Sequence, residues 1–364
     1  MDSKRYNNIK IGVGIGKAVI SFLLIMIFVV AGFSERLTIL LYQYSSSNYI
    51  VLLLFIVVIG IVSSVLFFPL NYYVSFYLEH KYKLSNQTFF QWIWENFKGV
   101  LVGGVIGIPV LLIFYYLLNL FGNWWWLPFA AIMFVLSVLL ARIVPILILP
   151  IFYKITPIDE GNLRDKIVNL ASESGMKVEN VFKFNMSKNT KKANAAFTGL
   201  GKTKRIILGD TLLENYSDEE IESVIAHELG HYVYKHILKN VVFGTVMSFL
   251  TFYAIAQFYE ISLSWFNFNE ITEIAALPVL SLWGMLIGVI QTPISNIISR
   301  KFEYQADEYA VRVTGKKDVF VNTLEKLTEQ NLGDKNPHPF IEWFFYSHPS
   351  INNRKFNINS LQIN

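Results

Sequence analysis

The sequence predicts a mainly α, polytopic membrane helical protein with six spans, or seven, that also carries a small α+β domain. Of its 364 residues, 53% are hydrophobic and only 16% are charged, whereas soluble proteins carry about 25% charged residues. The charges are also segregated, because long uncharged stretches alternate with two polar pieces. This composition excludes a disordered chain, a nucleic-acid scaffold and an ordinary cytosolic enzyme.

The N-terminal membrane region, residues 1–153, is predicted to contain four spans, or five. A helix needs about 20 predominantly apolar residues to cross a bilayer, and each predicted span exceeds that length. The first has a basic N-terminal flank but no small-residue cleavage site after it, so we interpret it as a retained anchor. The spans lie in residues 11–33, 37–78 and 99–153, and the last stretch holds two that meet at Gly122 and Asn123.

The segment from Trp124 to Tyr153 is too long for one straight span and contains Pro145 and Pro150. Proline removes a helical hydrogen bond and bends the chain. We therefore expect a tilted or kinked helix, or a span followed by a re-entrant piece. The sequence leaves the choice between six and seven spans open.

Two further spans are predicted to form a membrane hairpin in residues 240–299. The connection between them, residues 260–273, has three glutamates and neither Lys nor Arg, whereas lysine is abundant in the polar piece that begins at Lys154. Basic residues favour the cytoplasmic side of a membrane. Six spans therefore place both termini and both polar pieces, residues 154–239 and 300–364, on the cytoplasmic side.

The two polar pieces are together long enough for one small domain. Apolar residues at helical spacing predict an amphipathic helix over 160–174, and residues 178–184 and 204–209 have the pattern of strands. Ser217 followed by Glu220 is typical of a capping box, in which each side chain bonds the backbone N–H of the other residue. This pair predicts the start of a helix.

That helix contains an H-E-x-x-H motif, from His227 and Glu228 to His231. Positions i and i+4 share a helix face, so both imidazoles can bind one ion, and Glu228 can reach a metal-bound water to take its proton. The chain has no cysteine, and two imidazoles with one carboxylate suit a zinc ion whose fourth position holds water. The alternative is two histidines that merely pack or cap, but this pattern seldom arises by chance among six histidines.

A third protein ligand is expected from the segment after the sixth span. The H-E-x-x-H helix is expected to lead straight into the fifth span, and the sixth span returns to the same membrane surface. Glu303 follows it, and Asp307, one turn on, could accept the second ring N–H of a ligand histidine. The alternative is a solvated acidic stripe, because Glu308 lies beside them. His236, which follows His231, is expected at the membrane interface rather than on the metal.

The motif HELGH, followed after a membrane hairpin by E-x-x-x-D, resembles the type I CAAX prenyl protease family. These are integral membrane zinc metallopeptidases related to the bacterial heat-shock membrane proteases. Three further segments resemble other signatures of the family: PILILPIFYKITP, NAAFTGLGKTKRIILGDTLL and SHPSINNR. The resemblance extends from about Leu78 to Arg354. Eukaryotic members have seven spans, one more than the six that are clear here.

The resemblance implies one zinc ion per chain, bound by His227, His231 and Glu303. It also implies that Glu228 is the general base and that Asp307 is the carboxylate behind the ligands.

The family resemblance further implies a substrate-binding strand and two residues beside the scissile bond. Asn194 and Ala195 match an edge strand whose backbone binds an extended substrate. His348 would stabilise the oxyanion, and Arg354 would orient neighbouring groups or the substrate.

The resulting prediction is a metalloendopeptidase that hydrolyses peptide bonds near the cytoplasmic face by metal-activated water. Its partners are a peptide or protein substrate, with lipid-modified and membrane-associated proteins as candidates, and the lipid bilayer. Nucleic acid is not expected as a partner. Basic residues of the polar piece lie beside the membrane, where they more often contact anionic lipid headgroups. The C-terminal sequence SLQIN shows no endoplasmic-reticulum retrieval signal, which favours a bacterial plasma membrane.

Two other functions compete with this prediction. One is quality control by a protease of the bacterial heat-shock type, which shares the motif but usually has two spans before the catalytic region, whereas four are predicted here. The other is a transporter or channel with a structural zinc, although an open-coordination site does not suit a purely structural ion.

Overall fold

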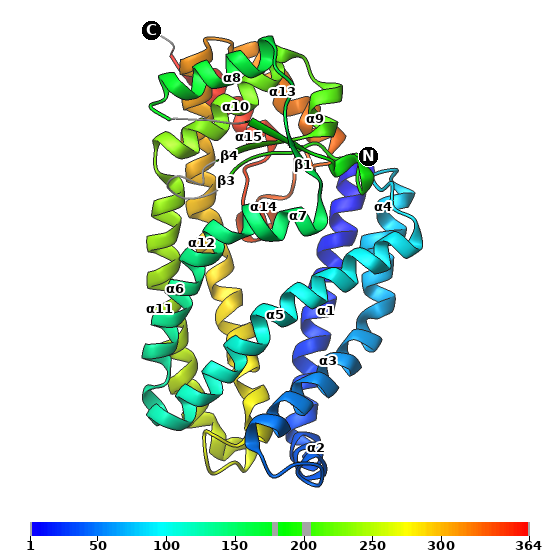
Figure 1. The fold of residues 1–364 in the computed structure, drawn as a ribbon, viewed down its shortest axis with the longest axis vertical. Helices are drawn as coiled ribbons and strands as arrows, with labels where there is room; N and C mark the ends of the chain where they lie inside the picture. Colours follow the sequence, from blue (N-terminus) through cyan, green and yellow to red (C-terminus); the bar gives the residue numbers. More distant parts are fainter. Residues whose placement is uncertain (1, 177–180, 199–204, 363–364) are drawn as a thin grey trace.

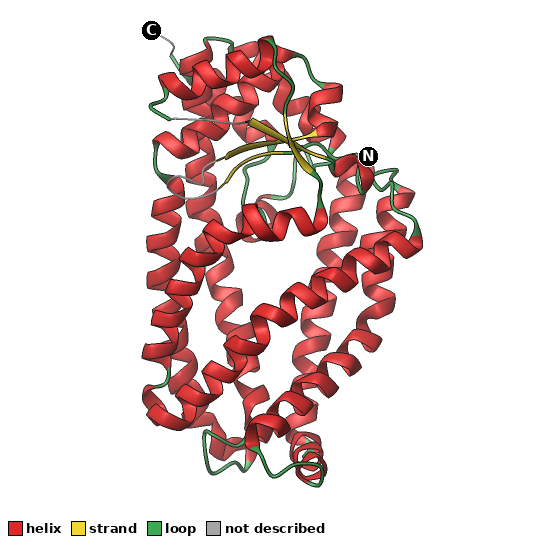
Figure 2. Ribbon diagram, in the orientation of Figure 1, coloured by secondary structure: helices red, strands yellow, loops and turns green. Residues whose placement is uncertain are grey.

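The computed structural model describes residues 2–176, 181–198 and 205–362. Long helices form most of the molecule, and a small sheet lies at one end of it among shorter helices (Figures 1 and 2). The helices are α1 (Asp2–Val30), α2 (Phe33–Tyr42), α3 (Asn48–Tyr72), α4 (Leu78–Lys81), α5 (Phe89–Phe121), α6 (Trp126–Ile143), α7 (Leu149–Phe152), α8 (Asn162–Glu173), α9 (Asp210–Asn215), α10 (Asp218–Val233), α11 (His236–Leu263), α12 (Leu277–Thr314), α13 (Lys317–Gln330), α14 (Pro339–Phe345) and α15 (Ile351–Ser360). The strands are β1 (Ile155–Pro157), β2 (Val181–Phe184), β3 (Ala195–Thr198) and β4 (Arg205–Gly209).

Six helices in the described ranges are long and apolar enough to cross a membrane, and they are built on α1, α3, α5, α6, α11 and α12. Large apolar side chains on them remain mostly exposed, such as Val65, Val105 and Ile290. Such faces suit a hydrocarbon environment, because a soluble protein rarely exposes so much contiguous apolar surface. The prediction of a polytopic helical membrane protein is confirmed, and the described residues contain six candidate spans.

The segment from Trp124 to Tyr153 is a kinked helix, which is one of the two expectations for it. A π-helical stretch, Val144–Ile148, separates α6 from α7 and contains Pro145. A proline in this position disrupts the α-helical hydrogen-bond ladder and bends the helix. α7 lies beneath the sheet in Figure 1, and the chain continues from it into β1, the first strand of the sheet.

The sheet has the strand order β1-β2-β4-β3. β2 and β4 are parallel, and the two outer pairs are antiparallel. Ile207 of the central strand β4 pairs with Phe182 on one side and Ala196 on the other, so β3 is an edge strand. Both predicted strands are present as β2 and β4, although residues 177–180 and 204 lie outside the described residues.

Packing against the sheet positions α10, the helix with the H-E-x-x-H motif. Its capping box forms as predicted, with reciprocal hydrogen bonds between Ser217 and Glu220. Ile225 and Leu229 on its inner face are fully buried in one apolar core with β4, α8 and α13. The core therefore fixes the rotation of α10, and with it the direction in which the motif points.

The expectation that α10 leads straight into the fifth span is wrong. α10 ends at Val233 and α11 begins at His236. Lys235 between them has a φ of 57°, in the left-handed region that interrupts an α-helix. The chain turns at this point, and His236 is carried back toward the end of α10.

Candidate metal centre

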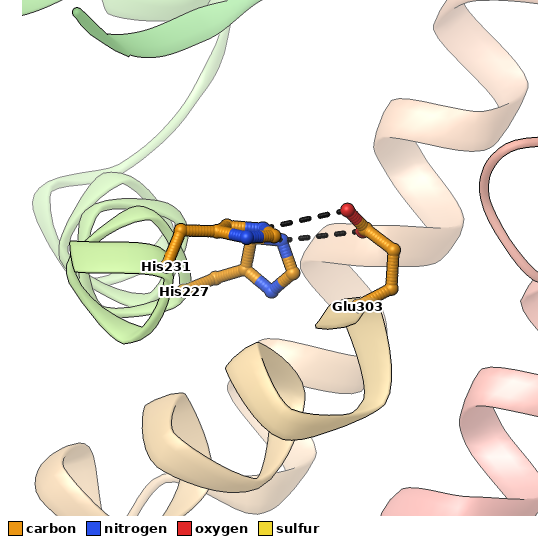
Figure 3. Close-up of side chains that lie close together, drawn as sticks. All are labelled: His227, His231 and Glu303. Carbon is orange, nitrogen blue, oxygen red and sulfur yellow. Dashed lines mark hydrogen bonds and ion pairs between the residues drawn. The ribbon is translucent and has the colours of Figure 1, made fainter. Parts of the chain in front are cut away.

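Three side chains from two helices converge at the membrane end of the small domain. His227 and His231 extend from α10 toward Glu303 of α12, as Figure 3 shows. The Nε2 atoms of the two histidines are 3.3 Å apart. His227 Nε2 lies 3.4 Å from Glu303 Oε2, and His231 Nε2 lies 3.4 Å from Glu303 Oε1.

The length of α12 explains how Glu303 reaches the motif. This helix of 38 residues continues from the sixth predicted span into the core of the small domain. Its backbone passes very close to α10, since a Cβ on Gly230 would be 2.9 Å from the Cα of Ala306. The glycine of the motif therefore permits the close contact that holds Glu303 opposite the histidines.

The donor set fits a metal ion. Two imidazole nitrogens and a carboxylate are the ligands of many catalytic zinc sites. Ligands at about 2.0–2.2 Å from a tetrahedral ion lie about 3.3–3.6 Å from one another. The separations of 3.3 and 3.4 Å between the facing atoms match this spacing. Each histidine faces a different oxygen of Glu303, so the three side chains already face one shared position where an ion could be held.

Asp307 and Arg354 support His227 from behind. His227 Nδ1 is 2.9 Å from Oδ1 of Asp307, and Arg354 Nε donates to Oδ2 at 2.9 Å. Burial alone would lower the pKa of His227, but its hydrogen bonds with Asp307 and Glu303 outweigh burial and raise this pKa to about 9. The carboxylates therefore make this position favourable for positive charge.

Glu228, predicted to be the general base, lies on α10 beside the cluster and is partly exposed. Burial alone would lower the pKa of Arg354, but the negative charges of Asp307, Glu303 and Glu228 raise it. Arg354 thus contacts Asp307 directly and is also influenced by the other two carboxylates. Its expected function of orienting neighbouring groups agrees with this position.

His348, for which the family resemblance implies a position beside the scissile bond, also lies at the centre. Its Nδ1 is 2.9 Å from Glu303 Oε2, while its side chain remains 66% exposed. A buried carboxylate that sequence reasoning missed holds the following turn, because Glu342 accepts hydrogen bonds from the Ser350 backbone at 3.0 Å and from Asn353 at 2.9 Å. His348 is thus exposed to solvent on a loop that the hydrogen bonds of Glu342 stabilise.

The predicted substrate strand is the edge strand β3, and it contacts α10. Ala195 opens β3 and pairs with Leu208, and Asn194 immediately before it accepts a hydrogen bond from the Gly209 N–H at 2.9 Å. These two residues lie on the strand beside the motif helix rather than within the cluster itself.

His236 is expected from the sequence at the membrane interface rather than on the metal, and no contact with His231 is predicted. The structure places His236 at the start of α11, where it is only 1% exposed, with Nδ1 3.0 Å from Nδ1 of His231. Its Nε2 lies 2.9 Å from Gln305 Oε1. No periodic pattern could reveal this contact, because it depends on the turn at Lys235.

Two family models together match nearly the whole chain. Residues 157–362 match the model described as "Peptidase family M48". Residues 1–154 match the model described as "CAAX prenyl protease N-terminal, five membrane helices". In that second part, four of the described helices are long and apolar enough to span a membrane.

Several known proteins are similar over most of their length. The chain is 33% identical to CAAX prenyl protease 1 of Saccharomyces cerevisiae over 83% of this chain and 70% of the relative. It is 28% identical to the uncharacterized metalloprotease YhfN of Bacillus subtilis over 97% of this chain and 83% of the relative.

A solved structure shares the fold. The crystal structure of S. mikatae Ste24p superimposes with a TM-score of 0.88 at 29% identity, covering 98% of this chain and 88% of that one. Sequence, site geometry and fold thus agree across both the membrane region and the small domain. The chain belongs to peptidase family M48, as an integral membrane metalloprotease of the CAAX prenyl protease family.

Proposed function

We propose that this protein is a zinc endopeptidase whose ion is held by His227, His231 and Glu303. The observation that carries the proposal is the convergence of their facing atoms at 3.3–3.4 Å. Three protein ligands would leave a fourth position of a bound ion to water, whereas a purely structural site typically has four protein ligands. A hydrolytic function is therefore better supported than a transporter or channel with a structural zinc.

The chemistry divides among the residues at the centre. When bound, zinc lowers the pKa of water and polarises the substrate carbonyl. Glu228 takes the proton from the attacking water and later delivers a proton to the leaving amine. His348, exposed beside Glu303, donates a hydrogen bond to the oxyanion that develops on the carbonyl. Arg354 holds Asp307, which keeps the His227 ring oriented.

The substrate is proposed to bind as an added strand along β3. An edge strand presents free backbone N–H and C=O groups that an extended peptide can pair with. Since β3 contacts α10, a peptide paired near Asn194 and Ala195 would run beside Glu228. In this binding mode the hydrogen bonds are made with the backbone of the substrate, so peptides with different side chains can bind.

The membrane setting narrows the substrate class. The metal centre lies where the fifth and sixth spans enter the small domain, so substrates would be cleaved close to the bilayer. We place this domain on the cytoplasmic side of a bacterial plasma membrane, because the hairpin connection 260–273 lacks basic residues. Membrane-associated proteins, lipid-modified ones included, are the substrates that such a position favours.

Purified protein with one replaced carboxylate tests the proposal. The wild type should contain one zinc per chain and cleave a peptide library, with fragments identified by mass spectrometry. Glu228→Gln should retain the zinc while cleavage falls below detection. The matched control is Glu219→Gln on the same helix as Glu228, which alters an exposed ion pair with Lys316 before α13 and should cleave normally. Undiminished cleavage by Glu228→Gln would contradict the proposed mechanism.

A quality-control protease of the heat-shock type remains the second candidate within the same chemistry. Proteomics of a strain lacking the gene separates the two. Accumulation of many misfolded membrane proteins would favour quality control, whereas a few uncleaved, specific precursors would favour a processing enzyme.

A further inference from the structure

The turn at Lys235 brings His236 against one of the two histidines of the motif. The left-handed conformation of Lys235 separates α10 from α11. As a result, the His236 ring lies with its Nδ1 3.0 Å from Nδ1 of His231. The ring is 1% exposed, so water does not compete for this contact.

Two residues of α12 hold the His236 ring in place. Gln305 Oε1 lies 2.9 Å from His236 Nε2. The ring of Phe302 stacks on the His236 ring, with 4.2 Å between the ring centroids and an angle of 11° between the planes. Both residues flank Glu303 in the sequence. The helix that supplies the carboxylate ligand therefore also fixes the ring beside the ligand histidine.

The donors and acceptors in this chain allow one consistent assignment. His231 directs Nε2 toward His227 and Glu303, so as a neutral ligand it carries its hydrogen on Nδ1. That hydrogen can be donated only if His236 Nδ1 is an acceptor. The hydrogen of His236 must then be on Nε2, from which it is donated to Gln305 Oε1.

We propose that His236 is a positioning residue that fixes the orientation and tautomer of His231 as a metal ligand, with Gln305 fixing His236 in turn. The proposal rests on the metal site of the proposed function. A partner of this kind behind a ligand histidine typically improves metal affinity or activity by about 10–100-fold.

The two ligand histidines thus have different supports. His227 has the carboxylate of Asp307, which Arg354 compensates. His231 has a neutral imidazole. A second carboxylate in the place of His236 would be buried, with the guanidinium of Arg354 already engaged by Asp307, and an uncompensated buried charge is costly. A neutral acceptor orients the ring without that penalty.

Three replacements of His236 separate its polar contacts from its packing. In His236→Asn, the amide oxygen takes the place of Nδ1 and can still accept from His231. In His236→Gln, the amide reaches the place of Nε2 and keeps only the contact with Gln305. His236→Phe keeps the stacked ring and neither contact. His338→Phe is the control, since among the described residues the hydrogen bond of the His338 side chain is the cap of α14, in which the Phe340 N–H donates to Nδ1 at 3.2 Å.

The primary measurement is zinc affinity by competition with a chelator, which does not depend on activity. His236→Phe and His236→Gln should bind zinc about 10–100-fold more weakly than the wild type, whereas His236→Asn and the control should stay within about threefold. The visible spectrum of the cobalt-substituted protein should change in His236→Phe and not in His236→Asn. In the peptidase assay kcat should fall, with KM nearly unchanged.

Zinc affinity of His236→Phe within twofold of the wild type would overturn the proposal, as would equal losses in His236→Asn and His236→Phe. If His236→Phe does not fold, Gln305→Leu is measured instead. This variant keeps His236 and removes the acceptor of its Nε2 hydrogen bond. Weaker zinc binding with a changed cobalt spectrum supports the proposal, and unchanged values refute it. A wild type that binds no stoichiometric zinc would instead contradict the proposed function.

Discussion

Arg354 binds Asp307 through two hydrogen bonds, from Nε to Oδ2 and from Nη2 to Oδ1. The carboxylate is fully buried and lies 2.9 Å from Nδ1 of His227. Arg354 of α15 thus orients Asp307, and Asp307 in turn orients His227 of α10. A guanidinium suits this position because two of its N–H groups can donate to both oxygens of the Asp307 carboxylate at the same time.

We expect Arg354→Ala to reduce both zinc binding and stability. It removes the guanidinium that pairs with the buried carboxylate of Asp307 and leaves that carboxylate with its contact to His227 Nδ1, and breaking a buried ion pair typically costs about 3–5 kcal/mol. Arg354→Lys keeps the charge but loses the paired geometry, so zinc affinity should fall by about 10-fold. Chelator competition and thermal melting of the two purified variants check this. Wild-type zinc affinity in Arg354→Ala would show that Asp307 does not depend on this partner.

Gly230→Ala should impair activity although it alters no polar group. The added Cβ would be 2.9 Å from Ala306 Cα and 3.1 Å from its carbonyl oxygen, so α12 must move and take Glu303 with it. Overpacking of this kind costs about 1–3 kcal/mol.

Gly288→Ala on α12, the helix that Gly230 of α10 packs against, is the control, because a Cβ there has no neighbour within 4 Å among the described residues. Melting temperature and kcat should fall in Gly230→Ala alone. Equal behaviour of the two variants would show that α10 and α12 tolerate a wider separation.

His348→Phe should lower kcat by about 100-fold or more, the usual cost of losing one donor to an oxyanion, with little change in KM. Steady-state peptide kinetics measure this. Because His348 also lies 2.9 Å from Glu303, zinc affinity is measured in parallel. A loss of zinc binding as large as the loss of kcat would indicate that His348 acts through Glu303 and not on the substrate.

The stability contributed by Glu220 should depend on pH. Burial alone would raise the pKa of Glu220, but hydrogen bonds from Lys326 and the Ser217 backbone outweigh burial and lower this pKa from 4.5. The contribution is therefore complete above the unfolded pKa and is lost as the pH falls through the lower folded pKa. The pair with Lys326 is partly exposed, so it is worth at most about 1 kcal/mol.

Glu220→Gln isolates this charge, because glutamine can still complete the capping box. The difference in unfolding free energy between wild type and variant should be measurable near neutral pH and should disappear once the pH falls below the lowered folded pKa of Glu220. Denaturation of both proteins at several pH values checks the prediction. A difference that stays constant with pH would assign it to packing.

The sequence alone determined the membrane character, the position of six long apolar stretches and the candidate residues of the centre. Each of these is written in local patterns: uncharged runs that exceed the length of a span, a capping box at Ser217, and two histidines four residues apart. Glu303 could also be expected, because the sixth span returns the chain to the membrane face of the motif.

The tertiary structure decided what surrounds those residues. The turn at Lys235, the contact of His236 with His231, and the bracing of the His348 loop by Glu342 have no local pattern. Each depends on groups brought together from distant helices or on a single backbone angle. The two histidines can be recognised from their spacing because one helix, α10, fixes it, whereas the hydrogen bonds that orient them exist only once α10, α12 and α15 have packed together.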